Sequence, residues 1–232
     1  MNRFSKCKRA LRQLCPGLAI LVFAACGMSD SESASRDAAG EYEVHYTITP
    51  VPASSTVHVE LRLKQARALL RELSFAARKG IADIKADGQV IEHGDRITWY
   101  PPATGGTLAW EATVRNQRAQ GQFDALLRAD WGIFRMEDII PRARTRTLKG
   151  AVSRTSFEFS LPTGWSAMTE YSSVDTPITV ERSERRFDQP TGWIAVGDLG
   201  VRRETIAGTR VAIVAPRGEY MRRMDMLALL NW

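Results

Sequence analysis

The sequence is poor in the side chains on which enzyme chemistry usually depends. It contains three cysteines and three histidines, and no cysteine follows Cys26. The later part of the chain therefore has no disulfide framework and no thiol nucleophile. The histidines, His45, His58 and His93, have neither the HExxH order nor the close spacing of a zinc site.

Motifs for catalysis and nucleotide binding are also missing. The chain has no GxSxG, P-loop or Rossmann glycine pattern. His45 and His58 alternate with apolar residues in two predicted strands, so we expect both on polar, solvated faces. The sequence therefore assigns no catalytic residue, no metal ligand and no cofactor-binding residue, although it leaves open whether a longer parent is an enzyme.

The net charge of +6 does not indicate a nucleic-acid partner, because much of the charge lies at the N-terminus. The first 25 residues contain no acid and carry Arg3, Lys6, Lys8, Arg9 and Arg12. Without this segment, basic and acidic residues are nearly equal in number. The basic charge is thus a feature of export, and we predict no nucleic-acid binding.

Residues 1–25 have the organisation of a signal peptide. A basic segment precedes the apolar stretch Leu14–Ala25, which is shorter than the roughly 20 residues that span a bilayer. It ends in Phe23-Ala24-Ala25-Cys26, which resembles the lipobox of bacterial lipoproteins, with Phe23 in place of the usual leucine. We predict lipidation of Cys26; the alternatives are an ordinary secretory signal cut nearby and an uncleaved anchor.

Residues 26–41 form the predicted lipidated cysteine and tether, in which serines alternate with small and charged residues. Each buried acyl methylene adds about 0.8 kcal/mol of membrane affinity, so several chains hold a domain durably. The membrane is therefore the expected partner, contacted through the lipid. Gly27 follows the cysteine, and resemblance to enterobacterial sorting then favours the outer membrane, facing the periplasm.

Hydrophobicity with a period of two dominates residues 42–217 and indicates half-buried strands. The clearest runs are Tyr42–Ile48, Val57–Leu63, Ile97–Trp99, Leu108–Val114, Phe157–Leu161 and Val211–Val214. Short strands separated by Gly and Pro favour antiparallel pairing over βαβ units. We predict a mainly β fold, an antiparallel β-sandwich-like domain with a C-terminal helix.

The predicted helix lies in residues 218–232 and runs from Glu219 to Trp232. Met221, Met224 and Ala228 share one side, and Arg222, Arg223 and Asp225 lie largely opposite. The apolar pattern continues to the last residue without a glycine cap or a polar tail. We therefore expect a fragment whose helix opens a missing second domain; a packed C-terminal helix is the alternative.

The most unusual stretch is Ala129–Pro141, where polar groups alternate with large apolar ones. Glu137 and Asp138 within it could form an acid–base pair, but neighbours on an extended chain point in opposite directions. A structural corner that packs Trp131, Phe134 and Ile139 is the favoured interpretation.

A basic cluster follows this stretch. If the chain is extended there, Arg142, Arg144 and Arg146 share one face, with Lys149 beyond them. That face could meet lipid headgroups or an acidic partner. Simple solvation of the arginines is favoured.

Two short segments have the same sequence, Pro-Thr-Gly-Trp: Pro162–Trp165 and Pro190–Trp193. Gly permits a left-handed turn that other residues resist. We predict two similar turns, each leading into a buried tryptophan.

Several of these stretches together resemble the N-terminal β-domain of the glycyl-aminopeptidase-like metallopeptidases of the gluzincin clan. They are Tyr42–Ile48, Val57–Leu63, Phe157–Trp165 and Phe187–Gly200. The resemblance implies a β-sandwich that precedes a helical domain with HExxH and a downstream glutamate. No residue here matches that zinc motif, so zinc is implied only for a missing domain.

Three functional hypotheses follow. The favoured one is the non-catalytic β-domain of a lipid-anchored, metallopeptidase-like envelope protein, truncated before its zinc motif. The second is a small outer-membrane lipoprotein that acts as a binding or structural module. The third and weakest is a stand-alone hydrolase built on scattered Asp, Ser and His residues. The sequence identifies no ligand and no protein partner.

Overall fold

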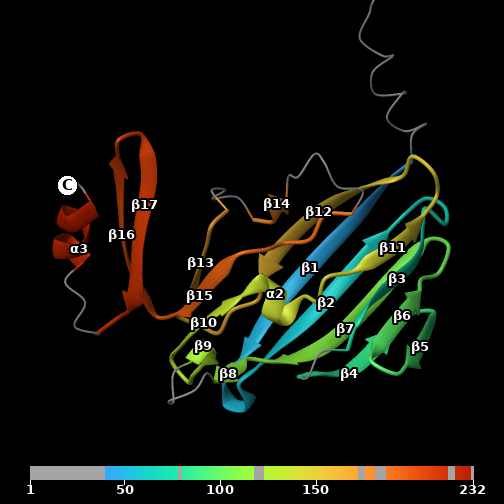
Figure 1. Ribbon diagram of the computed structural model, residues 1–232, viewed down its shortest axis with the longest axis horizontal. Helices are drawn as coiled ribbons and strands as arrows, with labels where there is room; N and C mark the ends of the chain where they lie inside the picture. Colours follow the sequence, from blue (N-terminus) through green and yellow to red (C-terminus); the bar gives the residue numbers. More distant parts are fainter. Residues whose placement is uncertain are drawn as a thin grey trace, which may run out of the picture.

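The computed structural model describes residues 40–77, 80–117, 123–171, 176–180, 187–218 and 223–230. Strands make up most of these residues and form three sheets and a separate hairpin (Figure 1). The described helical segments are short: the 3-10 turn η1 (Pro52–Ser54), α2 (Met136–Ile139) and α3 (Arg223–Leu230). The predicted mainly β fold is therefore confirmed.

The first sheet has six strands in the order β14-β12-β1-β2-β7-β4. Their bounds are β1 Glu41–Val51, β2 Thr56–Lys64, β4 Ile81–Ala86, β7 Gly105–Thr113, β12 Val152–Phe159 and β14 Ile178–Val180. The period of two correctly places Tyr42, Val44, Tyr46 and Ile48 in the core, where each is at most 1% exposed. The pairing is antiparallel except between β1 and β12, which run parallel.

A four-stranded sheet packs against one face of the first. Its antiparallel strands, in the order β11-β3-β6-β5, are β3 Leu70–Ala76, β5 Gln89–His93, β6 Arg96–Tyr100 and β11 Arg144–Thr147. Phe75 of β3 meets Trp110 of β7 with ring centroids 5.8 Å apart. The two sheets thus bury one common core between them, as a β-sandwich does.

The third sheet has five strands in the order β13-β15-β10-β9-β8. They are β8 Arg115–Gln117, β9 Phe123–Leu127, β10 Trp131–Arg135, β13 Ser166–Thr169 and β15 Trp193–Gly197. Phe134 and Ile194 from its inner face belong to the same core. A third sheet therefore contributes side chains to the core of the sandwich.

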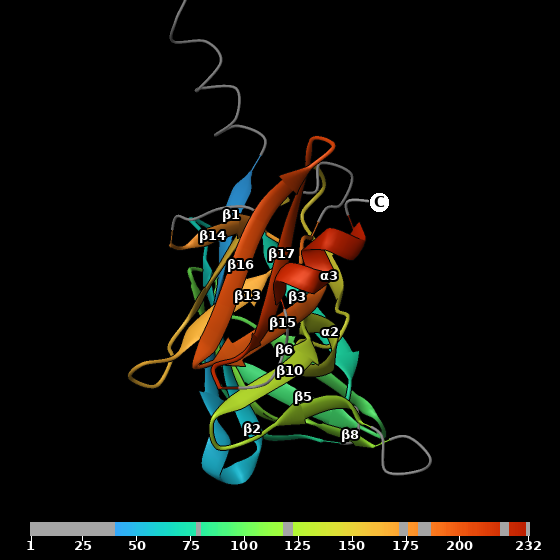
Figure 2. The ribbon, with the colours of Figure 1, turned by 90° about the vertical axis from the view of Figure 1, so that its left-hand side faces the viewer.

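The strands β16 (Leu199–Ile206) and β17 (Thr209–Pro216) form the hairpin, which contacts α3. The hairpin and α3 lie at one end of the molecule, on the left in Figure 1, and therefore stand in front of the sheets in Figure 2. The described part of the predicted C-terminal helix is α3, and residues 219–222, 231 and 232 lie outside the described residues. Among the described residues, no helix is long and apolar enough to cross a membrane.

The two Pro-Thr-Gly-Trp segments require one correction. Both glycines adopt positive φ, 83° at Gly164 and 95° at Gly192, as the turn prediction requires. The tryptophans, however, are not fully buried: Trp165 is partly buried and Trp193 is 45% exposed. Trp193 faces outward because the next residue of the strand, Ile194, faces the core, and the guanidinium of its cross-strand partner Arg135 lies 4.5 Å from the centre of the indole ring.

Candidate functional site

The one site residue that the sequence singles out, Cys26, lies outside the described residues, as does the signal peptide. Lipidation there stays a prediction. The first described strand begins at Glu41, the last residue of the predicted tether. A lipid at Cys26 would therefore be joined to β1 through residues 27–40.

His45 and His58 lie on partly solvated strand faces, as expected, with side chains 26% and 40% exposed, and each also contacts a carboxylate, which the sequence did not predict. The His45 Nδ1 lies 2.9 Å from Ser156 Oγ, and its Nε2 lies 3.4 Å from a Glu158 oxygen. The His58 Nδ1 lies 2.8 Å from Glu111 Oε1. Strand pairing creates both contacts, because β12 and β7 carry the partner residues beside β1 and β2.

No zinc site can be built from these groups. Each histidine has one carboxylate partner, and no group of three His, Cys, Asp or Glu side chains within the described ranges could hold a metal ion. A structural or catalytic zinc needs at least three protein ligands. The described residues therefore do not fit the zinc of a metallopeptidase.

The Glu137-Asp138 pair belongs to a structural corner, as predicted, although the chain is not extended there. The two residues lie in the single helical turn α2. Asp138 Oδ2 accepts a 3.0 Å hydrogen bond from Arg135 N, and Glu137 Oε2 accepts one of 3.1 Å from Gly192 N. The corner packs Phe134 and Ile139, both fully buried, whereas Trp131 is only partly buried. Both carboxylates accept hydrogen bonds from backbone N–H groups, so they stabilise the corner and are not an acid–base pair.

Asp188 and Gln189 have structural roles that the sequence did not reveal. Asp188 is 6% exposed, its N–H donates to Ser153 Oγ, and its carbonyl accepts from the Thr155 hydroxyl. Gln189 Oε1 accepts from Ala143 N and its Nε2 donates to Pro141 O, both at 2.9 Å. The segment before β15 is thereby joined both to β12 and to the chain that leads into β11.

Two tyrosines lie beside this segment. Burial raises the pKa of Tyr46 well above its ordinary value. Burial, followed by the charge of Asp188, does the same to the pKa of Tyr42. Both hydroxyls therefore stay neutral at physiological pH and act as structural groups.

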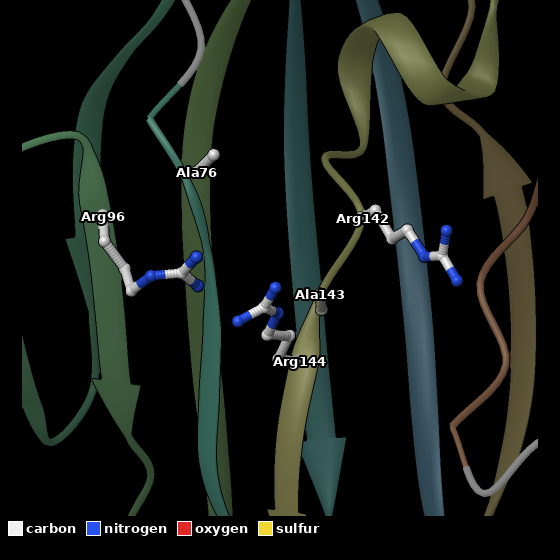
Figure 3. Close-up of a pocket in the computed structure, with 5 residues that line it drawn as sticks. All are labelled: Ala76, Arg96, Arg142, Ala143 and Arg144. Carbon is white, nitrogen blue, oxygen red and sulfur yellow. The ribbon is translucent and has the colours of Figure 1, made fainter.

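A basic cavity lies on the outer face of the four-stranded sheet. It has a volume of about 520 Å³ and is lined by Ala76, Arg96, Arg142, Ala143 and Arg144. Figure 3 shows the side chains of Arg96 and Arg144 extending toward one another, whereas the guanidinium of Arg142 turns away from them.

The basic cluster predicted from the sequence is extended, but the Arg142 side chain turns away from that of Arg144 (Figure 3). Arg142, Arg144 and Arg146 are exposed and alternate with partly buried residues. Strand pairing gives the arginines different partners. Arg146 Nε lies 3.3 Å from a Glu72 oxygen, whereas Arg144 lies opposite Ser74 on the neighbouring strand. The third lining arginine, Arg96, comes from β6, and no pattern in the sequence singles it out.

Comparison with known proteins supports the fold. No family model and no curated protein matches the chain. Among solved structures, an aminopeptidase N family protein from Idiomarina loihiensis aligns with a TM-score of 0.61 at 15% identity, over 81% of this chain and 35% of that chain. A mutant M1 zinc metallopeptidase from Deinococcus radiodurans aligns over 83% of this chain and 51% of that one, at 12% identity. Its TM-score of 0.40 is too low to support a common fold.

The chain is thus similar in fold to part of an aminopeptidase N family protein and spans about a third of that protein's length. At 15% identity, this similarity shows a common fold.

Proposed function

We propose that this chain is the non-catalytic β-domain of a metallopeptidase-like protein of the bacterial envelope, tethered to the membrane by a lipid on Cys26. The fold similarity carries the proposal, since most of this chain aligns with only 35% of an aminopeptidase N family protein. In this proposal the β-domain supports a zinc-bearing domain that lies elsewhere in the parent protein. It faces the periplasm, on the outer membrane.

The surface of α3 supports the presence of a further domain. Met224, Met226 and Leu229 are 61%, 46% and 73% exposed. Met226 and Leu229 are three residues apart and so share one side of α3, and neighbouring exposed apolar side chains mark interaction surfaces in soluble proteins. A following domain that packs on α3 would remove them from water.

Zinc content and aminopeptidase activity test the catalytic part of the proposal. The natural product of the gene and this 232-residue chain would be purified in parallel and compared. Zinc and activity in the natural product alone are expected. A natural product that contains no zinc and cleaves no aminoacyl substrate would contradict the proposal and favour a lipoprotein binding module.

The lipid anchor has its own test. The Cys26→Ser variant is expected to move from the membrane fraction to the soluble periplasmic fraction, and mass spectrometry should find acyl chains on Cys26 of the unaltered protein. Cys15→Ser is the matched control, because Cys15 lies before the predicted cleavage point. Equal membrane association of both variants would contradict lipidation at Cys26.

A further inference from the structure

We infer that Arg96 and Arg144 form a binding site for a small oxyanion, a molecule that carries a carboxylate or phosphate group. The site is the basic cavity on the outer face of the four-stranded sheet. This inference is independent of the metallopeptidase proposal, because it rests on side chains that the β-domain itself contains.

The first argument is uncompensated charge. Arg96 donates one long hydrogen bond, 3.4 Å, to the Ser74 hydroxyl. Across the described ranges, neither Arg96 nor Arg144 has a carboxylate within ion-pair distance. Two guanidinium groups that extend toward one another repel, and an anion between them would replace that repulsion with attraction (Figure 3).

The second argument is a contrast between neighbouring positions on one strand pair. Glu72 of β3 lies opposite Arg146 of β11 and neutralises it. The next outward position on β3 is Ser74, opposite Arg144, and the one after it is Ala76, opposite Arg96. On this face of the sheet, Arg146 is therefore neutralised by a carboxylate, whereas Arg144 and Arg96 face a cavity.

The third argument is shape and rigidity. The cavity volume of about 520 Å³ is typical of sites for small molecules. Ala76 and Ala143 keep the space open because their side chains are short. The backbone on either side of Ala143 is fixed, since Gln189 bonds Ala143 N and Pro141 O. A fixed backbone lowers the entropic cost of holding Arg144 in place for a ligand.

The chemistry of arginine defines the ligand class. A guanidinium presents paired N–H groups that match two oxygens of one carboxylate or phosphate. Two such groups facing one cavity favour an anion with several oxygens over chloride. Arg142 adds positive charge at the rim of the cavity without aiming at its centre (Figure 3).

Isothermal titration calorimetry on the full chain, kept in a non-ionic detergent, tests the site. Inorganic phosphate and succinate would be titrated separately at constant ionic strength, with chloride as the blank. We expect saturable binding at one site for at least one of the two anions. Arg96→Gln and Arg144→Gln should each weaken that binding about tenfold, the effect of losing a charge-assisted hydrogen bond.

Two further variants separate this site from general attraction to a positive protein. Arg62→Gln removes the same charge from the outer face of the six-stranded sheet, where the Arg62 side chain is 67% exposed, and should leave the affinity unchanged. Arg144→Lys keeps the charge but loses the paired N–H groups, so it should also weaken binding. Circular dichroism and melting curves without ligand verify that each variant is folded.

A second experiment distinguishes the two sources of the anion, a lipid headgroup and a free anion. Vesicles with and without phosphatidylglycerol show whether a lipid phosphate also reaches the site, because binding through the site should weaken in Arg144→Gln whereas binding through the N-terminal lipid should not. Phosphate binding combined with vesicle binding that Arg144→Gln leaves unchanged assigns the site to free anions. Three results would overturn the inference. They are no saturable binding in the millimolar range, equal loss in Arg62→Gln and Arg144→Gln, and phosphatidylglycerol-dependent vesicle binding that Arg144→Gln reduces but neither small anion inhibits.

Discussion

The sandwich and the hairpin–helix end of the molecule bury their apolar side chains very differently. In the sandwich, large residues such as Trp99, Tyr46 and Phe134 are fully buried in one continuous core. In the hairpin, Leu199, Ile213 and Ala215 are the buried apolar residues, and none of them belongs to that core. On α3, the described side chains are exposed.

This difference shows which part of the chain is stable by itself. Stability is supplied mainly by the apolar area removed from water, and the sandwich has far more of it. The hairpin and α3 have few buried contacts, so they belong to the segments expected to open at low free-energy cost. In the proposed function, a further domain packs on these elements and buries their exposed apolar side chains.

The largest expected effect comes from making the same substitution, Leu→Ala, in both regions. Leu108→Ala removes a fully buried side chain of β7 and should lower the free energy of unfolding by about 2–5 kcal/mol. Leu229→Ala, at a position that is 73% exposed, should change it by less than about 0.5 kcal/mol. Urea denaturation measures both. Similar losses in the two variants would contradict the division into a stable and a marginal region.

The Gln189 contacts provide the next largest effect. Gln189→Ala leaves Ala143 N and Pro141 O without their side-chain partner, which should cost about 1–3 kcal/mol. It should also weaken oxyanion binding, because the backbone beside Arg144 is released. Gln89→Ala, on an exposed position of β5, is the control for the same side-chain loss. Equal melting temperatures of the two variants would show that the Gln189 hydrogen bonds do not stabilise the link between the segment before β15 and the chain that leads into β11.

Alkaline pH should destabilise the sandwich through its buried tyrosines. Tyr42 and Tyr46 keep their protons in the folded state to a higher pH than in the unfolded state, where the pKa of tyrosine is about 10. Their stabilisation is therefore complete below that pH. Above it, each tyrosine should lower the free energy of unfolding by about 1.4 kcal/mol per pH unit until the folded state also ionises.

Denaturation curves between neutral pH and strongly alkaline pH measure this slope. Tyr46→Phe should reduce it, because one of the two ionising groups is gone. A slope that is the same in the variant and the unaltered chain would assign the alkaline effect to other groups.

The smallest effect distinguishes local from global opening. Ile213→Val trims a buried methylene in the hairpin and should cost about 0.5–1.5 kcal/mol. Hydrogen exchange should speed up at amides of β16 and β17 and stay unchanged in β1 and β2. Ile48→Val, the same change inside the sandwich, should instead speed exchange across all three sheets.

The sequence predicts the parts of the fold that depend on local periodicity. The alternation in Tyr42–Ile48 and Val57–Leu63 identifies buried strand faces because one face of each strand meets the core. It does not reveal β3, where Leu73, Ser74 and Phe75 are buried in succession and the alternation is lost. The parallel pairing of β1 and β12 was not predicted either, because pairing partners far apart in sequence leave no periodic signal.

The basic cavity shows the same limit at a site. Arg144 belongs to a visible run of arginines, but Arg96 stands alone in the sequence. Only the pairing of both β11 and β6 with β3 brings the two arginines to one cavity. Likewise, nothing near Arg146 in sequence identifies Glu72 as its partner.

The most direct test of the account is hydrogen–deuterium exchange at α3 and the β16–β17 hairpin, measured in this chain and in the natural gene product. The account predicts fast exchange of these amides here and strong protection in a longer natural product, where a following domain covers Met224, Met226 and Leu229. Slow exchange in this chain, or equally fast exchange in both proteins, would contradict the claim that this β-domain supports a second domain.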